Sequence, residues 1–299
     1  MINDIIRNLI DRGPMIGREL LEAIGNVDQF ELWKACYSYD TLQISSFARY
    51  YLRYDISRSE YIRLSPSIIR DFLTYTIVGL PHQRGELHRR HLILCNQHRD
   101  ISLMKLRIVT ELFREIETQV SARAQQTICA FIAGDIAYFM GHAEQRPSAS
   151  GEIMSGSDID VIIVHTSDAD PADLKIIDDM LSVRKTHLMK HPDFRQELDF
   201  IIKPIERVAG QVKYASIEDK IASKIIFESL LVWGSAGVYT QIKTLLDHSG
   251  AADRIRSDFL IAIEERTEAI ANILSASGKS VDVNTKSLFY ATQERIEFS

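Results

Sequence analysis

The chain has 299 residues, of which 45% are hydrophobic and 25% are charged, which is enough to bury two domains or three small ones. Its net charge of −6 argues against a nucleic-acid coat or a membrane-surface binder, although local basic patches are compatible with it. Scattered cysteines, a start that lacks an apolar signal core and the lack of any apolar run of about 20 residues predict a cytoplasmic protein with no disulfide framework and no membrane partner.

Residues 1–58 are predicted to form a small module of three helices followed by a hairpin. The third helix is expected to follow Asn26, a residue that favours the N-cap position, and residues 42–45 and 49–56 are expected to be the two strands. This order, together with the phrase from Gly13 to Leu20, resembles the winged helix-turn-helix of bacterial regulators. The resemblance implies DNA or a protein as the partner of this module.

The charges of this module help to distinguish DNA from a protein as its partner. In the DNA-binding interpretation, the helix over residues 27–37 enters a major groove. That helix holds Asp28 and Glu31 against Lys34, and residues 1–60 carry seven Lys and Arg against nine Asp and Glu. Because DNA affinity comes largely from neutralising phosphates, this composition opposes DNA binding. A module used for protein contacts or dimerisation is the alternative, and both stay open.

Residues 59–125 are predicted to be a helical connector. Ser65-Pro66 is typical of a helix start, residues 79–85 are expected to be a linker, and Asp100 is expected to open a long amphipathic helix. The segment His88-Arg89-Arg90-His91 is the strongest basic patch of the chain. It is either a contact for a nucleic-acid or phosphate partner or a solvated face of the connector.

Residues 126–215 contain the pattern that most strongly indicates a catalytic site. Asp158 and Asp160 stand at the entrance of a strand whose next residues, 161–164, are all apolar. Side chains two residues apart on a strand project to the same side. Like charges held so close repel each other, so a fold that keeps both ionised usually places a cation between them. A later strand, residues 197–202, brings a third carboxylate, Asp199.

The run from Ser157 to Ile162, with Asp199 on a later strand, resembles the polymerase-beta-like nucleotidyltransferase superfamily. The resemblance implies that Asp158 and Asp160 hold two Mg²⁺ (or Mn²⁺) ions, which bind a nucleoside triphosphate with ATP as the expected donor. It also implies that Asp199 touches the catalytic metal and helps to activate an acceptor hydroxyl. Two metals suit this chemistry because they stabilise both the attacking and the leaving oxygen of an in-line displacement.

The glycine turn that binds phosphates in this superfamily has two candidate positions here. Gly134 follows a predicted buried strand but lies 24 residues before Asp158 and is followed by Asp135 instead of Gly or Ser. This spacing predicts an inserted loop over residues 143–154. The other position is Gly156-Ser157, so Gly134, Gly156 and Ser157 are the candidate nucleotide-binding residues.

Residues 216–299 are predicted to be a helical cap on the core. A helix starting at Ser216 is expected to continue until it is ended by Gly234 to Gly237, and it carries basic residues one turn apart. These lie either beside the triphosphate or on a solvated face, where Lys224 pairs with Glu228. Further helices are predicted after this one.

The sequence therefore predicts an α+β protein with a mixed-sheet nucleotidyltransferase core, flanked by a winged-helix-like module and C-terminal helices. The expected function is transfer of a nucleoside monophosphate from a triphosphate to a hydroxyl of a small molecule, a protein or an RNA, by two-metal catalysis. The alternative is a nucleotide-sensing transcriptional regulator, or a DNA- or partner-binding protein that uses the winged-helix module.

Overall fold

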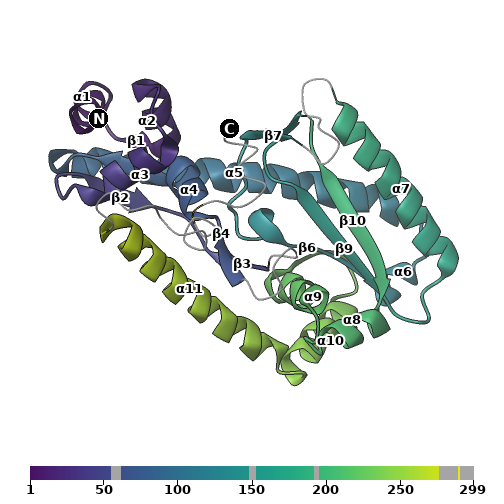
Figure 1. Cartoon of the computed structure of the whole chain (residues 1–299). Coiled ribbons are helices and arrows are strands. Elements are labelled where there is room, and N and C mark those ends of the chain that lie inside the picture. Colours follow the sequence, from purple (N-terminus) through teal and green to yellow (C-terminus); the bar gives the residue numbers. More distant parts are fainter. Residues whose placement is uncertain (55–61, 148–152, 192–194, 276–288, 290–299) are drawn as a thin grey trace. The chain divides into compact units, whose positions relative to one another are not determined.

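The structure is a computed structural model that describes residues 1–54, 62–147, 153–191, 195–275 and 289 (Figure 1). These residues mix helices with small sheets, which confirms the α+β class predicted from the sequence. The chain divides into two compact units: Met1–Arg53, Ile62–Gln97 and Asp258–Ser299 form unit 1, and Tyr54–Tyr61 and His98–Ser257 form unit 2. The four finer segments, with boundaries at residues 58, 125 and 215, stay predictions.

Unit 1 begins with three helices, as expected. They and the first two strands are α1 (Ile2–Arg12), β1 (Met15–Ile16), α2 (Gly17–Ile24), α3 (Gln29–Ser38) and β2 (Gln43–Ser46). Asn26 is not the cap of the third helix. Asp28 is the N-cap of α3, because its carboxylate accepts hydrogen bonds from the amides of Phe30 and Glu31 at 2.9 and 3.3 Å.

The predicted hairpin of residues 42–45 and 49–56 is wrong. β2 pairs instead with β5 (Thr76–Gly79), which lies between β1 and β2 in an antiparallel sheet, whereas β3 (Tyr51–Tyr54) pairs with β4 (Ile62–Ser65). Residues 55 and 56 lie outside the described part. The local pattern identified both extended pieces, but a strand's partner is chosen by burial, and Ile77 and Val78 are fully buried in the central strand.

The helix expected after Ser65-Pro66 is short and begins later. Ser67 is its N-cap, α4 covers Ile68–Arg70, a π-helical turn covers Asp71–Tyr75, and β5 follows. Residues 76–78, Thr-Ile-Val, are all β-branched, and such side chains favour a strand over a continuation of the helix. The predicted linker over residues 79–85 contains a short 3₁₀ turn, and the long helix α5 (Arg84–Glu117) starts well before Asp100.

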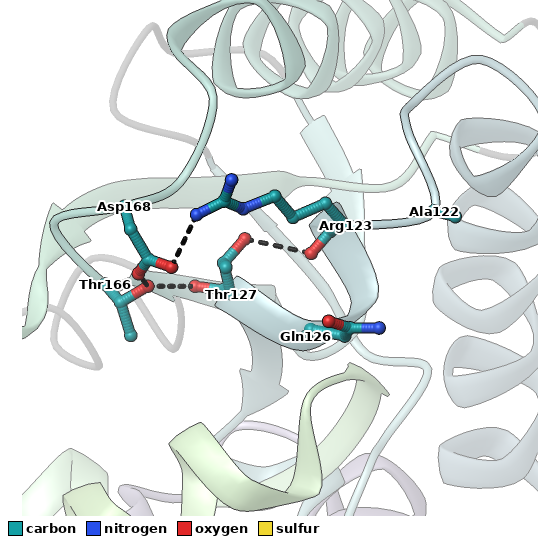
Figure 2. Close-up of a pocket in the computed structure, with 6 residues that line it drawn as sticks. All are labelled: Ala122, Arg123, Gln126, Thr127, Thr166 and Asp168. Atoms are coloured by element: carbon teal, nitrogen blue, oxygen red, sulfur yellow. Dashed lines mark hydrogen bonds and ion pairs between the residues drawn. The ribbon is translucent and has the colours of Figure 1, made fainter.

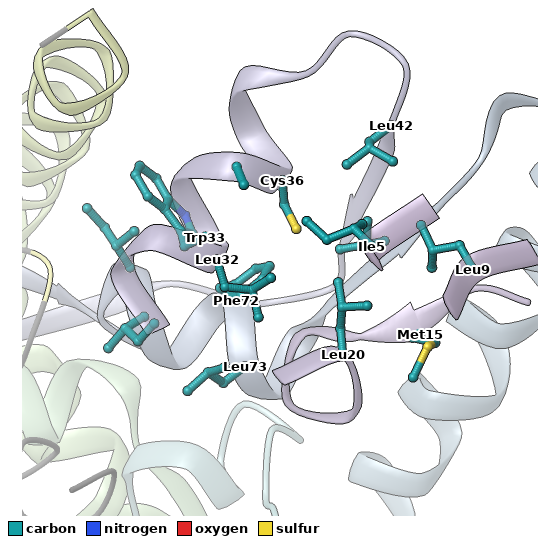
Figure 3. Packing of buried hydrophobic residues seen from close by; sticks show 14 of the residues in the cluster. Ile5, Leu9, Met15, Leu20, Leu32, Trp33, Cys36, Leu42, Phe72 and Leu73 are labelled. Atoms are coloured by element: carbon teal, nitrogen blue, oxygen red, sulfur yellow. The ribbon is translucent and has the colours of Figure 1, made fainter. Parts of the chain in front are cut away.

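The core of unit 1 is formed by apolar side chains of its helices (Figure 3). In α3, Leu32, Trp33, Ala35 and Cys36 are all buried. The ring of Phe289 is also fully buried and lies edge-on to Trp33, with ring centroids 5.1 Å apart. A large part of the α3 surface is therefore used for packing.

A buried carboxylate organises the polar part of unit 1. Asp71 accepts hydrogen bonds from the hydroxyl groups of Ser46, Thr76 and Tyr50, at 2.7, 3.1 and 2.5 Å. Arg266 of α11 (Ala251–Ser275) completes the group with an ion pair to Asp71 at 2.9 Å. Both charged side chains are about nine-tenths buried, so each depends on the other for its charge to be compensated.

Unit 2 is built on a four-stranded sheet in the order β10-β9-β6-β11. Its strands are β6 (Ile128–Ile132), β9 (Ile159–His165), β10 (Leu198–Pro204) and β11 (Leu230–Gly234). β9 and β10 are parallel and are joined through α7 (Pro171–Lys190), and the other neighbours are antiparallel. The three strands predicted for the core are present. β11 was not predicted: α9 (Ile217–Glu228) ends earlier than expected, and the Leu-Leu-Val-Trp run after it pairs with β6.

The two faces of this sheet differ. One face packs its apolar side chains, among them Ile159, Val161 and Leu198, against residues of α5 and α7 such as Phe113 and Ile177. The opposite face carries the residues at alternate positions and adjoins the segment containing α8 (Ile205–Gln211), α9 and α10 (Ala236–His248). Within the described residues, no helix has both the length and the apolar character needed to cross a membrane.

Candidate functional site

Asp158 and Asp160 lie where the sequence analysis expected them, at the start of β9. Ile159 and Val161 are buried in the core with α5 and α7, whereas Asp160 is exposed and Asp158 is partly buried. This alternation places the Asp160 carboxylate on the face of the sheet opposite to that core. The carboxylate is therefore accessible to a ligand.

Asp199 lies next to Asp160. The two residues are register partners on the parallel strands β10 and β9, and register partners on neighbouring strands are about 4.8 Å apart and share a face. The carboxylate of Asp199 forms an ion pair with Lys185 of α7, and both side chains are partly exposed. The third acid is thus placed beside the pair, with a lysine as its present counter-ion.

Gly134 follows the end of β6 and lies next to Asp160. Its φ of 71° lies in the region that glycine adopts without strain. A Cβ atom at this position would lie 3.8 Å from Oδ2 of Asp160. The Gly134 turn and the acidic strand, which are far apart in sequence, are therefore adjacent in the fold.

The second candidate turn, Gly156-Ser157, has a different geometry. The amide of Gly156 donates to the carbonyl of Glu144 at 2.8 Å, and the amide of Ser157 donates to the carbonyl of His142 at 3.1 Å. A Cβ atom on Gly156 would lie 1.8 Å from that His142 carbonyl oxygen, so the chains approach as closely as only glycine allows. Both of these amides are bonded to backbone carbonyls, whereas the amide of Gly134 donates to a side chain, that of Glu228, which can move more easily.

The segment between the two turns is not simply a loop, as the sequence analysis expected for residues 143–154. β7 (Gln145–Pro147) and β8 (Ile153–Ser155) form an antiparallel pair, and residues 148–152 between them lie outside the described part. The residues of this segment are mostly polar and small, so the sequence showed no strand pattern for β7 and β8. The side chain of Asp135 is held by Ser157, whose hydroxyl donates to it at 3.1 Å, so this carboxylate has a structural partner.

Lys105 of α5 was missed by the sequence analysis. Its ammonium group is buried and donates to the carbonyl of Ser157 at 2.6 Å, to the carbonyl of Ser155 at 3.3 Å and to the side-chain oxygen of Gln196. It therefore ties together the chain just before Asp158 and the chain just before β10. The signal was present: Lys105 lies four residues after Ile101, on the apolar stripe of the long helix.

Glu228, at the end of α9, is the second important residue whose role was missed. Its carboxylate accepts from Nζ of Lys224 at 2.6 Å, from the amide of Gly134 at 3.1 Å and from the hydroxyl of Tyr138. The predicted pairing of Lys224 with Glu228 is confirmed, but the predicted solvated face is wrong, because the two side chains are only 11% and 2% exposed. Burial raises the pKa of Glu228, and the lysine and the amide act in the opposite direction.

The donors available for a metal ion are carboxylate oxygens, which suit hard cations such as Mg²⁺ and Mn²⁺. Asp158, Asp160 and Asp199 would supply them at neighbouring positions. Among the residues described, no three or more His, Cys, Asp or Glu side chains are already gathered closely enough to hold a metal ion. Asp199 would have to exchange Lys185 for a cation, so the site fits in donor type and location and requires a side-chain rearrangement.

A shallow pocket of about 580 Å³ lies at the other end of the same sheet (Figure 2). It is lined by Ala122, Arg123, Gln126, Thr127, Thr166 and Asp168. Arg123 and Asp168 form an ion pair across it at 2.9 Å. Thr127 precedes β6 and Thr166 follows β9, whereas Gly134 and Asp160 lie at the opposite ends of these strands. This pocket is therefore separate from the acidic site.

Comparison of the chain with protein-family models, with curated proteins and with solved structures gave no match. Its function has to be inferred from the residues and their arrangement.

Proposed function

We propose that the protein is a metal-dependent nucleotidyltransferase. It transfers a nucleoside monophosphate from a triphosphate, with ATP as the expected donor, to a hydroxyl group of a small molecule, a protein or an RNA, and it releases pyrophosphate. One observation carries the proposal: Asp160 and Asp199 are register partners on parallel strands, and the Gly134 turn adjoins them. Two carboxylates and a glycine turn thereby lie at one end of one sheet, and Asp158 directly precedes β9 at the same end.

The roles of the chain's own residues follow from their places. Asp158 and Asp160 would hold divalent cations, and cations bound there would stabilise the attacking and leaving oxygens of the displacement. Asp199, on the edge strand and half exposed, would orient the acceptor hydroxyl and take its proton once Lys185 has moved aside. The Gly134 turn would receive the phosphates, because glycine lets the backbone approach them closely.

We assign unit 1 to protein contacts in preference to DNA binding. Its β1-β5-β2 sheet and three helices are compatible with the winged-helix-like module expected from the sequence. However, α3 buries Leu32, Trp33 and Cys36, and the carboxylate-bearing Glu31 is on its exposed side. A helix that presents negative charge and packs most of its bulk inward is a poor reader of a phosphate-lined groove. The regulator alternative is therefore the weaker one.

The enzyme proposal is tested with Asp158→Asn and Asp160→Asn. Each keeps the shape of the side chain and removes a charge that would hold a cation. We expect Mg²⁺-dependent pyrophosphate release, measured with each labelled triphosphate and a cell extract as the source of acceptor, to fall by about 100-fold or more. Asp168→Asn, at the other end of the sheet, is the matched control and should retain activity. Pyrophosphate release that persists in both site variants would refute the assignment.

A further inference from the structure

The carboxylate of Glu228 lies in a position that is prepared for an anion. Three donors of different origin meet there: the amide of Gly134, the hydroxyl of Tyr138 and the ammonium group of Lys224. The Glu228 side chain is 2% exposed. We call these three donors the Glu228 anion site. It belongs to unit 2, where α9 lies beside the end of β6 (Figure 1).

The same donors are those that bind phosphate oxygens in proteins. Backbone amides of a glycine turn, an ammonium group and a hydroxyl all donate to anionic oxygens, and such charge-assisted bonds are stronger than neutral ones. The Gly134 turn is also the turn that adjoins Asp160. A phosphate bound at this turn would need the amide that Glu228 now occupies.

Helix stability does not explain why Glu228 is where it is. It is the last residue of α9, and a negative charge at the C-terminal end of a helix is unfavourable. The carbonyls of that helix end are instead satisfied by Lys243 of α10, which donates to Ile226 and Phe227 at 2.5 and 3.0 Å. The Glu228 side chain can therefore leave its position without removing the bonds that hold the helix end.

From these contacts we propose that Glu228 is a built-in competitor of the substrate's phosphates. In the free protein its carboxylate occupies the Glu228 anion site; when a nucleoside triphosphate binds, a phosphate takes its place and Lys224 exchanges the carboxylate for the phosphate. This inference rests on the proposed function. It adds a regulatory element: the chain tunes nucleotide affinity through one of its own carboxylates.

The test uses the full chain and two probes, ATP with Mg²⁺ and inorganic tripolyphosphate, with dissociation constants measured by calorimetry. Glu228→Gln keeps an acceptor for the Gly134 amide and removes the competing charge, so both probes should bind about tenfold more tightly or better. Lys224→Met should weaken both. Glu218→Gln, on the exposed first turn of the same helix, is the matched control and should change neither.

Glu228→Asp provides a second variant if the glutamine variant folds poorly. It keeps the charge but shortens the side chain by one methylene, which withdraws the carboxylate from the amide, so a smaller gain in affinity is expected. Equal or weaker binding in both Glu228 variants would overturn the inference. The proposed function would still stand after such a result if ATP binding by the wild-type protein required Mg²⁺ and was lost in Asp160→Asn. If no variant and no wild-type protein bound either probe, both would fail.

Discussion

Replacing Lys105 with methionine tests whether this buried ammonium group holds the chain before Asp158 in place. Methionine has nearly the same length and no donor. The lysine has three acceptors, but the carbonyl of Ser155 also receives the side-chain amide of Gln196 at 3.2 Å. The other two acceptors, the carbonyl of Ser157 and the side-chain oxygen of Gln196, therefore lose their donor without a replacement.

Each buried acceptor left without a donor costs about 1–3 kcal/mol, so two cost about 2–6 kcal/mol. The variant also no longer has to bury an ammonium group, and that change offsets part of the loss. We therefore expect the free energy of unfolding of unit 2 to fall by about 2–3 kcal/mol, toward the lower end of the range.

The assay can be confined to the relevant unit because the chain has only two tryptophans. Trp33 lies in unit 1 and Trp233 in unit 2, so Trp33→Phe leaves a fluorescence signal from unit 2 alone. Urea unfolding in that background gives the midpoint and the slope, and a pure stability change moves only the midpoint.

The control for this experiment is the same substitution at Lys175. This lysine is exposed on α7 and pairs with Asp179 at 2.9 Å, so Lys175→Met should leave the urea midpoint unchanged. If Lys105→Met unfolds at the same urea concentration as this control, or at a higher one, the role assigned to Lys105 is wrong.

Two further predictions concern unit 1, read by Trp33 in a Trp233→Phe background. Arg266→Met should lower the free energy of unfolding by about 3–5 kcal/mol because it leaves the buried Asp71 without its cation, and adding Asp71→Asn should recover part of that loss. An additive double variant would contradict this coupling. Phe289→Ala should cost about 3 kcal/mol and shift the Trp33 emission, since the two rings lie 5.1 Å apart. Unchanged emission would show that Phe289 does not pack there.

The parts of the site that could be predicted are those that depend only on neighbouring residues in the sequence. The alternation of Ile159, Asp160 and Val161 specifies which side of the strand is buried, so the placement of Asp160 on the face opposite the core followed from the residues alone. The placement of Asp158 on that same face stays a prediction. Asp199 was found as a third acid on a second predicted strand, which was expected to be buried and which the structure places at the edge of the sheet. Its place directly beside Asp160 depends on the register between the strands, which the structure supplies.

The parts that were missed depend on contacts between distant segments. β11 is short, and its residues form a strand because the neighbouring edge of β6 is available to them. Glu228 looks like an ordinary charged residue of a helix, and Lys105 differs from one only by lying on an apolar stripe, until both meet their partners in the folded unit. Only then do their charged groups meet carbonyl and amide groups that water cannot reach.

The register between β9 and β10 links correct folding of the sheet to correct assembly of the acidic site. Sliding one strand by a single residue would put Leu198 or Phe200 beside Asp160 in place of Asp199. Since side chains alternate, the slip would also turn the Asp199 carboxylate toward the core with α5 and α7 and expose Leu198, which is now buried. Molecules with the slipped register would thus be poorly folded. Cellular quality control that removes poorly folded molecules would therefore also remove those in which Asp160 and Asp199 are not neighbours.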